Sequence, residues 1–189
     1  MIEFIEEEHL YLLDGVIIPS VSEILHFIFP NKYLNVPKEV LNAKASYGTT
    51  IHEIIEKVEK NKEIPNLNYI QEASLNQYLR LKQEYKIEVL KQEQIVHYED
   101  KYAGRFDMIA NVNNEYSLCD IKTTSILDKE YLSWQLSLYA FAKNEKFDKL
   151  YAIWLPKKDL GQLVEINRKT DEEILKILKQ FQERKNYCE

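Results

Sequence analysis

The residues whose types and spacing could do chemistry lie in two apolar runs on either side of a turn signal, Asn113-Asn114. This pattern predicts an antiparallel hairpin with Asp107 on its first strand and Asp120 and Lys122 at the end of its second. Strand residues alternate between faces, so Asp120 and Lys122 share one face while Ile121 takes the other. Two carboxylates on neighbouring strands could hold a divalent cation such as Mg²⁺, which prefers oxygen ligands. The lysine could then polarise a phosphate or hold a water molecule.

The spacing of an acidic residue two positions before a lysine is uninformative by itself, because it occurs four times in this chain. The copy at Asp120 differs from the others: it ends an apolar strand and follows Gly104-x-x-Asp107. An expected helix then carries Gln135 and Tyr139, which are four residues apart and so project from one face. Their amide and phenol could orient a carboxylate, a water molecule or a DNA strand. The four copies are Glu84-Tyr85-Lys86, Glu99-Asp100-Lys101, Asp120-Ile121-Lys122 and Glu183-Arg184-Lys185.

This constellation resembles the PD-(D/E)xK nuclease superfamily, and in particular its RecB-like branch, which includes many phage exonucleases. A further mark of the family, Gly-x-x-x-His on an upstream helix, is met by Gly48 and His52. The resemblance covers about residues 43–155. It implies an α/β fold with a mixed central β-sheet flanked by helices, the core of the restriction endonucleases. It also implies metal-assisted hydrolysis of phosphodiester bonds.

The resemblance implies a set of metal ligands for Mg²⁺ or Mn²⁺. Asp107 and Asp120 would be the metal carboxylates, and the backbone carbonyl of Ile121 would be a further ligand. His52 and Glu93 would complete the set. Without the resemblance, a helical histidine such as His52 is more often a core or surface residue. Glu93, on the strand before the hairpin, could equally be a surface charge at a strand edge.

The resemblance also implies roles for the remaining site residues. Lys122 would orient or help to deprotonate the attacking water, a task suited to an ammonium whose pKa moves on burial. Gln135 and Tyr139 would fix the geometry of the site. The partner would be DNA. The resemblance also allows a homo-oligomer and a recombination or annealing partner protein.

The expected elements follow from apolar periodicity and turn signals. Their order is that of an α/β protein with a mixed sheet and an N-terminal β-hairpin. They are a hairpin of Leu10–Leu13 and Val16–Ile18, a helix from the capping box at Ser20 through Phe29, helices over 38–62 with Gly48 near a break or a close backbone contact, a helix over 66–90, a strand over 93–98, the hairpin around Asn113-Asn114, a helix over 130–143, strands over 149–155 and 162–166, and a helix over 171–187.

A chain of 189 residues suits one domain. We expect a single nuclease domain over 1–189, with a hairpin and helix over 1–30, the nuclease core over 43–155 and a C-terminal strand and helix over 156–189. With 45% hydrophobic and 30% charged residues the composition is that of a soluble globular protein, and no apolar run approaches the length of a membrane span. The N-terminus lacks the pattern of a signal peptide, so we expect a cytoplasmic protein.

Charge and cysteine content narrow the class further. The net charge of −6 is carried by the first thirty residues, which hold six acidic residues and no Lys or Arg. The rest of the chain is balanced, which is compatible with a basic groove for DNA. An iron–sulfur cluster is disfavoured, because the chain has only Cys119 and Cys188 and such a cluster needs four thiolates.

Three alternatives remain open. The order of the motifs, and the little surface that a short chain has for reading bases, favour an exonuclease of phage or recombination and repair type. A structure-specific or single-strand endonuclease would use the same residues. A non-catalytic nucleic-acid-binding module could keep the fold, and a structural or regulatory protein could contain an incidental Asp-x-Lys strand.

Overall fold

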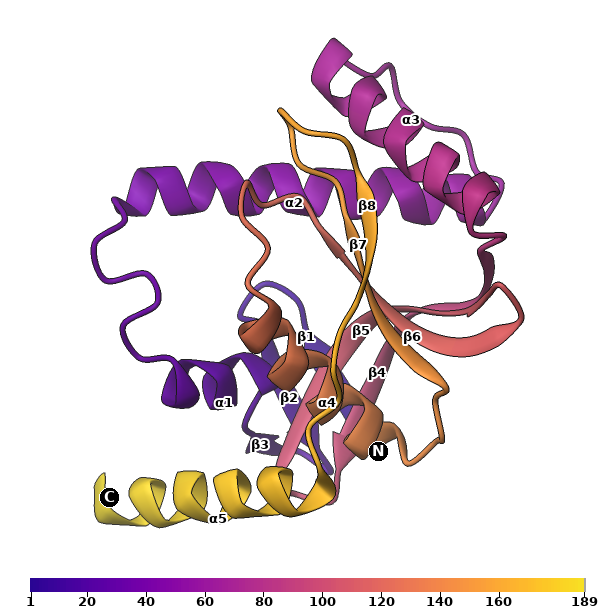
Figure 1. Ribbon diagram of the computed structural model, residues 1–189. Coiled ribbons are helices and arrows are strands. Elements are labelled where there is room, and N and C mark those ends of the chain that lie inside the picture. Colours follow the sequence, from indigo (N-terminus) through magenta and orange to yellow (C-terminus); the bar gives the residue numbers. More distant parts are fainter. Residues whose placement is uncertain (189) are drawn as a thin grey trace.

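A mixed five-stranded sheet forms the centre of the structure, a computed structural model that describes residues 1–188 and the side chains of residues 1–184 (Figure 1). In their order across the sheet, its strands are β4 (Glu88–Tyr98), β5 (Tyr102–Val112), β6 (Glu115–Lys122), β7 (Lys149–Trp154) and β8 (Gln162–Glu165). Strands β6 and β7 are parallel and the other neighbours are antiparallel. The parallel pair needs a crossover, which contains α4 (Lys129–Lys143). The predicted α/β fold with a mixed sheet is confirmed.

Three short strands form a second, antiparallel sheet at the N-terminus. They are β1 (Ile2–Ile5), β2 (Leu10–Leu13) and β3 (Val16–Ile18). The predicted hairpin of β2 and β3 is confirmed, with positive φ angles of 50° at Asp14 and 82° at Gly15 in the turn. Strand β1 was not among the elements with predicted bounds, because four residues are too few for a periodic pattern. A bridge between Ser20 and Ala103 joins the end of this sheet to β5.

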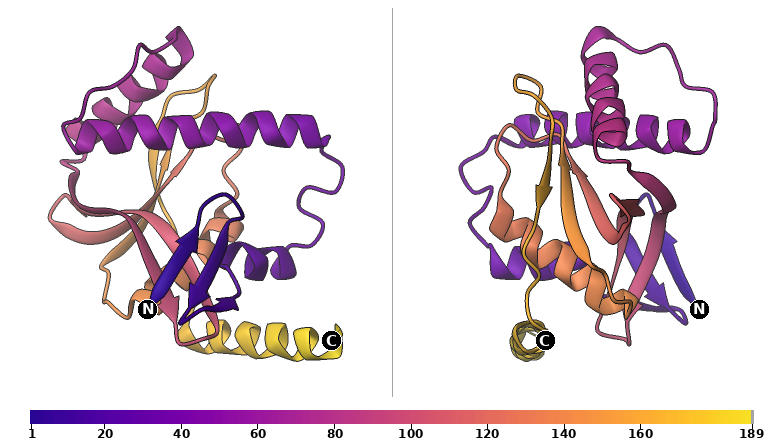
Figure 2. Two further views of the ribbon diagram at one scale, coloured as in Figure 1. Left: turned by 180° about the vertical axis from the view of Figure 1, so that it is seen from behind. Right: turned by 45° about the vertical axis from the view of Figure 1, so that its right-hand side comes forward.

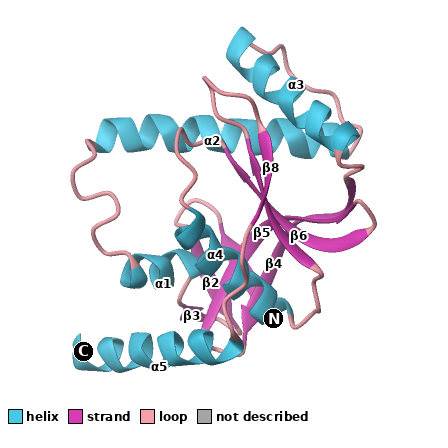
Figure 3. Ribbon diagram, in the orientation of Figure 1, coloured by secondary structure: helices cyan, strands magenta, loops and turns pink. Residues whose placement is uncertain are grey.

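The helices pack in two apolar cores that share the central sheet. One core contains residues of α1 (Val21–Ile28), α4 and α5 (Asp171–Cys188), and the other contains residues of α2 (Lys38–Glu59) and α3 (Tyr69–Glu84). Figures 2 and 3 show α2 and α3 together at the end of the molecule away from α5. Strand β6 serves both cores, because Leu118 lies in the first while Cys119 and Ile121 lie in the second. Asp120 and Lys122 are thereby left to face a site.

Two boundaries differ from the sequence predictions. Helix α2 runs without a break through Gly48, where an added Cβ would lie 3.5 Å from Thr123 Oγ1, an ordinary contact. Helix α3 ends at Glu84, because Lys86 takes a positive φ of 49° and the chain turns into β4. Residues 88–90, predicted as helix, are therefore strand, since pairing with β5 overrides their helical periodicity.

Helix α1 begins as the sequence predicts. Ser20 Oγ accepts a hydrogen bond from the backbone N–H of Glu23, and the Glu23 carboxylate accepts one from the backbone N–H of Ser20. This capping box satisfies two N–H groups that the first turn of a helix leaves without partners. It fixes α1 beside β5, where Val21 is fully buried.

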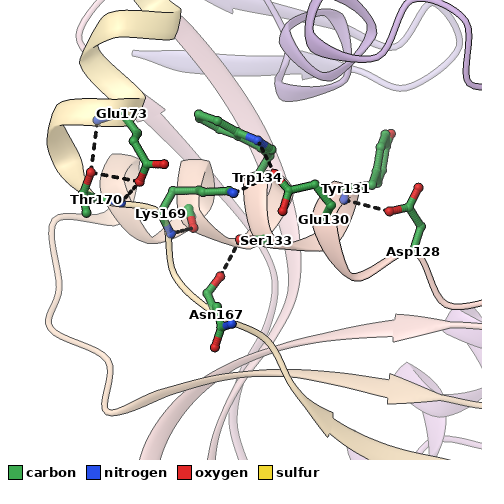
Figure 4. Close-up of polar contacts among 10 residues, drawn as sticks. Asp128, Glu130, Tyr131, Ser133, Trp134, Asn167, Lys169, Thr170 and Glu173 are labelled. Carbon is green, nitrogen blue, oxygen red and sulfur yellow. Dashed lines mark hydrogen bonds and ion pairs between the residues drawn. The ribbon is translucent and has the colours of Figure 1, made fainter.

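Helix α4 is held in place by hydrogen bonds at its first turn and by contacts with the segment before α5 (Figure 4). The Asp128 carboxylate caps its first turn by accepting from the backbone N–H of Tyr131 at 3.0 Å. Further along, the Ser133 hydroxyl donates to the backbone carbonyl of Asn167 at 2.5 Å, and the Lys169 ammonium lies 2.6 Å from Glu130. These contacts tie α4 to the segment before α5, so the helix presents a fixed face to β5 and β6. None of the helices in the described part of the chain is long and apolar enough to span a membrane.

Candidate active site

The candidate site lies where the central sheet forks. The β5–β6 ladder runs from Val112–Glu115 as far as Met108–Cys119, and the next residues, Asp107 and Asp120, are not paired through the backbone. Beyond that point β5 continues beside β4, while β6 continues beside β7 as far as Lys122. Backbone groups at the fork lose their ladder partners, so other groups must satisfy them.

Side chains take over the hydrogen bonds of the peptide at Ile121. Asp107 Oδ2 accepts from the backbone N–H of Ile121 at 2.6 Å. His52, from α2, places Nε2 at 3.0 Å from the backbone carbonyl oxygen of Ile121 and Nδ1 at 3.4 Å from Asp107 Oδ1. The motif histidine and the first motif carboxylate therefore hold both sides of the backbone between Asp120 and Lys122.

Strand register brings three carboxylates into one row. Glu93 on β4 lies between the pairs Gln92–Met108 and Gln94–Phe106, which places it opposite Asp107, and Asp107 is the next residue after the last β5–β6 pair, level with Asp120. Glu93 takes a positive φ of 49°, an uncommon conformation for a residue with a side chain. All three carboxylates line one pocket of about 330 Å³.

Three of these groups could hold a metal ion. One ligand atom from each of His52, Glu93 and Asp107 lies within 4.8 Å of the others. Asp120 lines the same pocket but lies outside this group, and its Oδ2 pairs with Lys122 Nζ at 2.6 Å. The carbonyl of Ile121 faces His52. The structure therefore brings the five residues expected as ligands into one region of the fold, and three of them have ligand atoms close enough together to share an ion.

The three carboxylates are close together and poorly solvated, so their negative charges repel one another. Burial, assisted by the charge of Asp107, raises the pKa of Glu93 to about 7. Burial likewise raises the pKa of Asp120 to about 6, although Lys122 opposes the change. For Asp107, burial is outweighed by His52, Lys122 and the N–H of Ile121, so its pKa is lowered. A hard divalent cation would relieve this repulsion, and the oxygen-rich donor set fits one.

His52 and Lys122 remain protonated at neutral pH. Burial lowers the pKa of His52, but attraction to Asp107 outweighs burial and raises the pKa to about 9. Lys122 behaves in the same way, because Asp120 and Asp107 together outweigh burial and raise its pKa. Both cations are thus paired with carboxylates that would also coordinate a metal ion.

The predicted pair on α4 lies against this row. Gln135 Nε2 is 3.5 Å from the Tyr139 hydroxyl, and both residues line the pocket. Gln135 Oε1 is buried and has no hydrogen-bond donor in the part of the chain that the structure describes. A buried amide oxygen without a partner is costly, so this atom suits a water molecule or a ligand in the pocket. Burial raises the pKa of Tyr139 well above its usual value, so the phenol stays a donor.

The motif glycine is explained by packing. A Cβ added at Gly104 would lie 2.6 Å from the Tyr139 ring and 2.9 Å from Val21 Cγ2. Both distances are too short for a real side chain, so only glycine lets α1 and α4 approach β5 this closely. Gly104 thereby sets the distance between the carboxylate on β5 and the polar pair on α4.

The pocket also contains residues that the sequence did not single out. Arg105 Nε lies 3.0 Å from Glu93 Oε2, and alternation along β5 could have indicated it, since it is two residues before Asp107. The wall made by the N-terminal sheet and α1 joins the site only through the tertiary fold, so no local pattern reveals it. The lining residues of this kind are Glu6, His9, Tyr11, Ser20, Val21, Ser22, Thr49, Glu53, Glu56 and Arg105.

Comparison with known proteins identifies the family of the chain. A family model described as the PD-(D/E)XK nuclease superfamily matches residues 26–186. The solved crystal structure of SSO0001 is similar, with a TM-score of 0.48 and 17% identity over 85% of this chain and 70% of that chain. Among proteins with curated annotation, none matches. Because the family model spans most of the sequence, the chain belongs to the PD-(D/E)XK nuclease superfamily.

Proposed function

We propose that this chain is a Mg²⁺- or Mn²⁺-dependent deoxyribonuclease that hydrolyses phosphodiester bonds. The observation that carries the proposal is the row of Glu93, Asp107 and Asp120 at the fork of the sheet, with Lys122 directly beside it. The row combines an excess of buried carboxylates with a lysine, and membership of the nuclease superfamily gives that combination its chemistry.

The proposed ligands are the residues gathered around Asp107. Asp107, Asp120, Glu93 and the carbonyl of Ile121 offer oxygen atoms, and His52 offers a nitrogen once it has lost its proton. When bound, the metal would activate water and offset negative charge on the phosphate. Binding would displace the proton of His52 and the contact between Lys122 and Asp120, because ligands must offer free lone pairs.

Once released from Asp120, Lys122 can act on the substrate. Its ammonium donates hydrogen bonds and can hold the attacking water or a phosphate oxygen. Gln135 and Tyr139 stand behind the row, and the unpartnered Oε1 of Gln135 can accept a hydrogen bond from that water. These residues orient the reactants and hold protons, while the bound metal would supply the charge.

We further propose that the chain acts from the ends of linear DNA in the cytoplasm, as a RecB-like exonuclease of phage or recombination and repair type. Support comes from the motif order Gly48 and His52, Gly104 and Asp107, then Asp120-x-Lys122.

The test compares covalently closed circular DNA with the same DNA linearised, in single- and double-stranded forms with Mg²⁺. Degradation of the linear forms alone supports exonuclease action. Rapid degradation of the closed circles would reject it and favour a structure-specific or single-strand endonuclease. A Lys122→Ala variant, purified and assayed in parallel, is the control for a contaminating nuclease. Activity from a contaminant would remain in the variant sample.

A further inference from the structure

The proposed catalytic pocket is poorly suited to attract DNA. Six carboxylates line it, against three cationic side chains, the protonated His52, Arg105 and Lys122, and all three are paired with carboxylates. Most of the affinity of proteins for nucleic acid comes from cations that neutralise phosphates. A metal ion offsets only part of the charge, so further attraction must come from another surface. The six carboxylates are Glu6, Glu53, Glu56, Glu93, Asp107 and Asp120.

A second concavity, of about 230 Å³, has the opposite character. Three segments form it: the first half of α2, the loop after β6 and the turn between β7 and β8. Figures 1 and 2 show this loop and this turn close to α2 in each view. We call it the lysine groove. Its lining residues are Lys44, Tyr47, Thr123, Thr124, Ser125, Pro156, Lys157, Lys158 and Asp159.

The lysines of the groove are free to meet an anion. Lys44, Lys157 and Lys158 are exposed, and no ion pair found among the described residues includes any of them. Lys157 Nζ lies 3.5 Å from the centre of the Tyr47 ring, which holds the ammonium over the groove without neutralising it. Against these three cations stands one carboxylate, Asp159. The hydroxyls of Thr123 and Ser125, on the loop after β6, can also donate hydrogen bonds to phosphate oxygens.

The groove adjoins the catalytic pocket along two segments of the chain. On β6, Lys122 lines the pocket and the next residue, Thr123, lines the groove. On α2, Thr49 lines the pocket and Tyr47 lines the groove, while Gly48 between them approaches Thr123. A strand of nucleic acid could therefore pass from one to the other without leaving the surface.

The length of α2 sets the distance between the two places. From His52 back to Lys44 are eight residues, or about 12 Å at about 1.5 Å per residue. One strand of a DNA duplex rises about 3.4 Å per nucleotide, so this distance corresponds to about three to four nucleotides.

We propose that the lysine groove binds the phosphodiester backbone of the DNA strand, about three to four nucleotides from the bond that is cut. This inference rests on the proposed function and adds to it the place where the flanking strand lies. The groove supplies the long-range attraction and the grip on phosphates, while the carboxylate pocket supplies the chemistry. Its contacts are to phosphates, so it carries no base preference.

The test removes the charge of the groove and measures binding against salt. A triple variant, Lys44→Gln, Lys157→Gln and Lys158→Gln, is compared with a matched triple variant, Lys146→Gln, Lys176→Gln and Lys179→Gln. The control lysines are also exposed, lie away from both concavities and carry the same total charge. Affinity for a labelled oligonucleotide is measured in Ca²⁺ over a range of salt. Exposed lysines contribute little to stability, so both variants should fold.

The slope of log affinity against log salt should be shallower by about two to three units in the groove variant, because each of three lost phosphate contacts contributes about 0.7 to 0.9. The control variant should keep the wild-type slope. Turnover at saturating DNA should stay within about twofold of wild type, since these lysines touch no reacting atom. Equal slopes for the two triple variants would overturn the inference.

Two further arms separate the sources of the phosphate. The groove variant should lose the same affinity, relative to wild type, for oligonucleotides with and without a terminal phosphate. Inorganic phosphate should compete only weakly with the oligonucleotide for binding. A loss confined to DNA with a terminal phosphate would overturn the inference in favour of an end-recognition pocket. Failure of the proposed function is distinguishable, because wild type would then show no metal-dependent cleavage. If wild type cleaves and the groove variant keeps its salt slope, the inference alone fails.

Discussion

The carboxylate pocket and the lysine groove lie side by side but are built differently. The proposed metal ligands of the pocket and Lys122 come from three neighbouring strands and from α2, so these groups are fixed by strand register and by hydrogen bonds such as that from Ile121 to Asp107. The groove takes its lysines from α2 and from a turn, and their side chains are exposed. The difference teaches that the groups proposed for chemistry are held rigidly, whereas the groups proposed for attraction need only be present.

This difference predicts how each region responds to change. Buried charges interact strongly and are little screened by salt, so pocket variants should have large effects that do not depend on ionic strength. Exposed lysines interact weakly and are screened, so groove variants should have small effects that grow as salt falls.

The largest effect is expected for Lys122→Ala and Asp120→Asn. If both residues serve the transition state, each change should lower turnover at least about 100-fold while the fold survives, at any salt concentration. Single-turnover cleavage of labelled DNA measures this effect. The matched controls, Glu84→Gln and Lys86→Ala, alter the same spacing at the end of α3, outside the pocket. Equal losses at both places would mean that the site is misplaced.

Gly104→Ala should disturb the pocket without touching a charge. The new Cβ would force Tyr139 or Val21 to move, at a cost of about 1 to 3 kcal/mol in the free energy of unfolding, and would lower turnover by shifting the polar pair on α4. Gly48→Ala is the control for stability, because a Cβ there meets Thr123 at an ordinary 3.5 Å inside a helix. It should stabilise the fold by about 0.5 to 1 kcal/mol. Denaturant unfolding of both variants measures these changes. Equal destabilisation of the two variants would refute the packing argument.

The imidazole of His52 should make stability depend on pH in metal-free protein. Its pKa is raised from 6.5 to about 9 in the folded state. The stabilising contribution is therefore fully present below about pH 6.5 and is lost as pH rises through about 9, with an upper limit on the order of 3 kcal/mol. Urea unfolding in EDTA of wild type and His52→Gln should show a difference that shrinks over this range. A difference that is constant with pH would exclude the ion pair with Asp107.

The smallest effect expected in the pocket is a gain in stability. Asp120→Asn removes one of the crowded carboxylates, so metal-free protein should become more stable at neutral pH by on the order of 1 kcal/mol. Because the same change removes a proposed ligand, added Mg²⁺ should raise the melting temperature of the variant less than that of wild type. Thermal unfolding with and without Mg²⁺ measures both effects. If the variant is less stable than wild type without metal, and if Mg²⁺ raises its melting temperature as much as that of wild type, the proposed role of Asp120 is contradicted.

The sequence predicted the parts of the fold that rest on local signals. The Asn113-Asn114 turn, the alternation along β6 and the capping box at Ser20 each have a short-range cause, and all three are present. It was wrong about the end of α3, where residues 88–90 belong to β4 and Glu88 and Val89 pair with β5. It was also wrong in dividing residues 38–62 into more than one helix, since α2 is continuous through Gly48, where a break or a close backbone contact had been left open. Both errors arose where long-range pairing or packing overrode local propensity.

The site divides in the same way. Spacing within single strands and helices indicated Asp107, Asp120 and Lys122, and the resemblance added His52 and Glu93. No local pattern could show that the sheet forks after the Met108–Cys119 pair, because the fork is a property of the register between strands. The same holds for the wall formed by the N-terminal sheet and for the lysine groove, whose residues come from segments more than a hundred residues apart.

The most direct test of the central claim is cleavage of linear DNA by the wild-type protein in Mg²⁺, Mn²⁺, Ca²⁺ and EDTA, with DNA binding measured in the same samples. A site of carboxylate oxygens predicts cleavage with Mg²⁺ or Mn²⁺, and binding without turnover with Ca²⁺, whose coordination is larger and looser. It predicts no cleavage in EDTA. Full activity in EDTA would contradict the claim that the carboxylates at the fork of the sheet act through a metal ion.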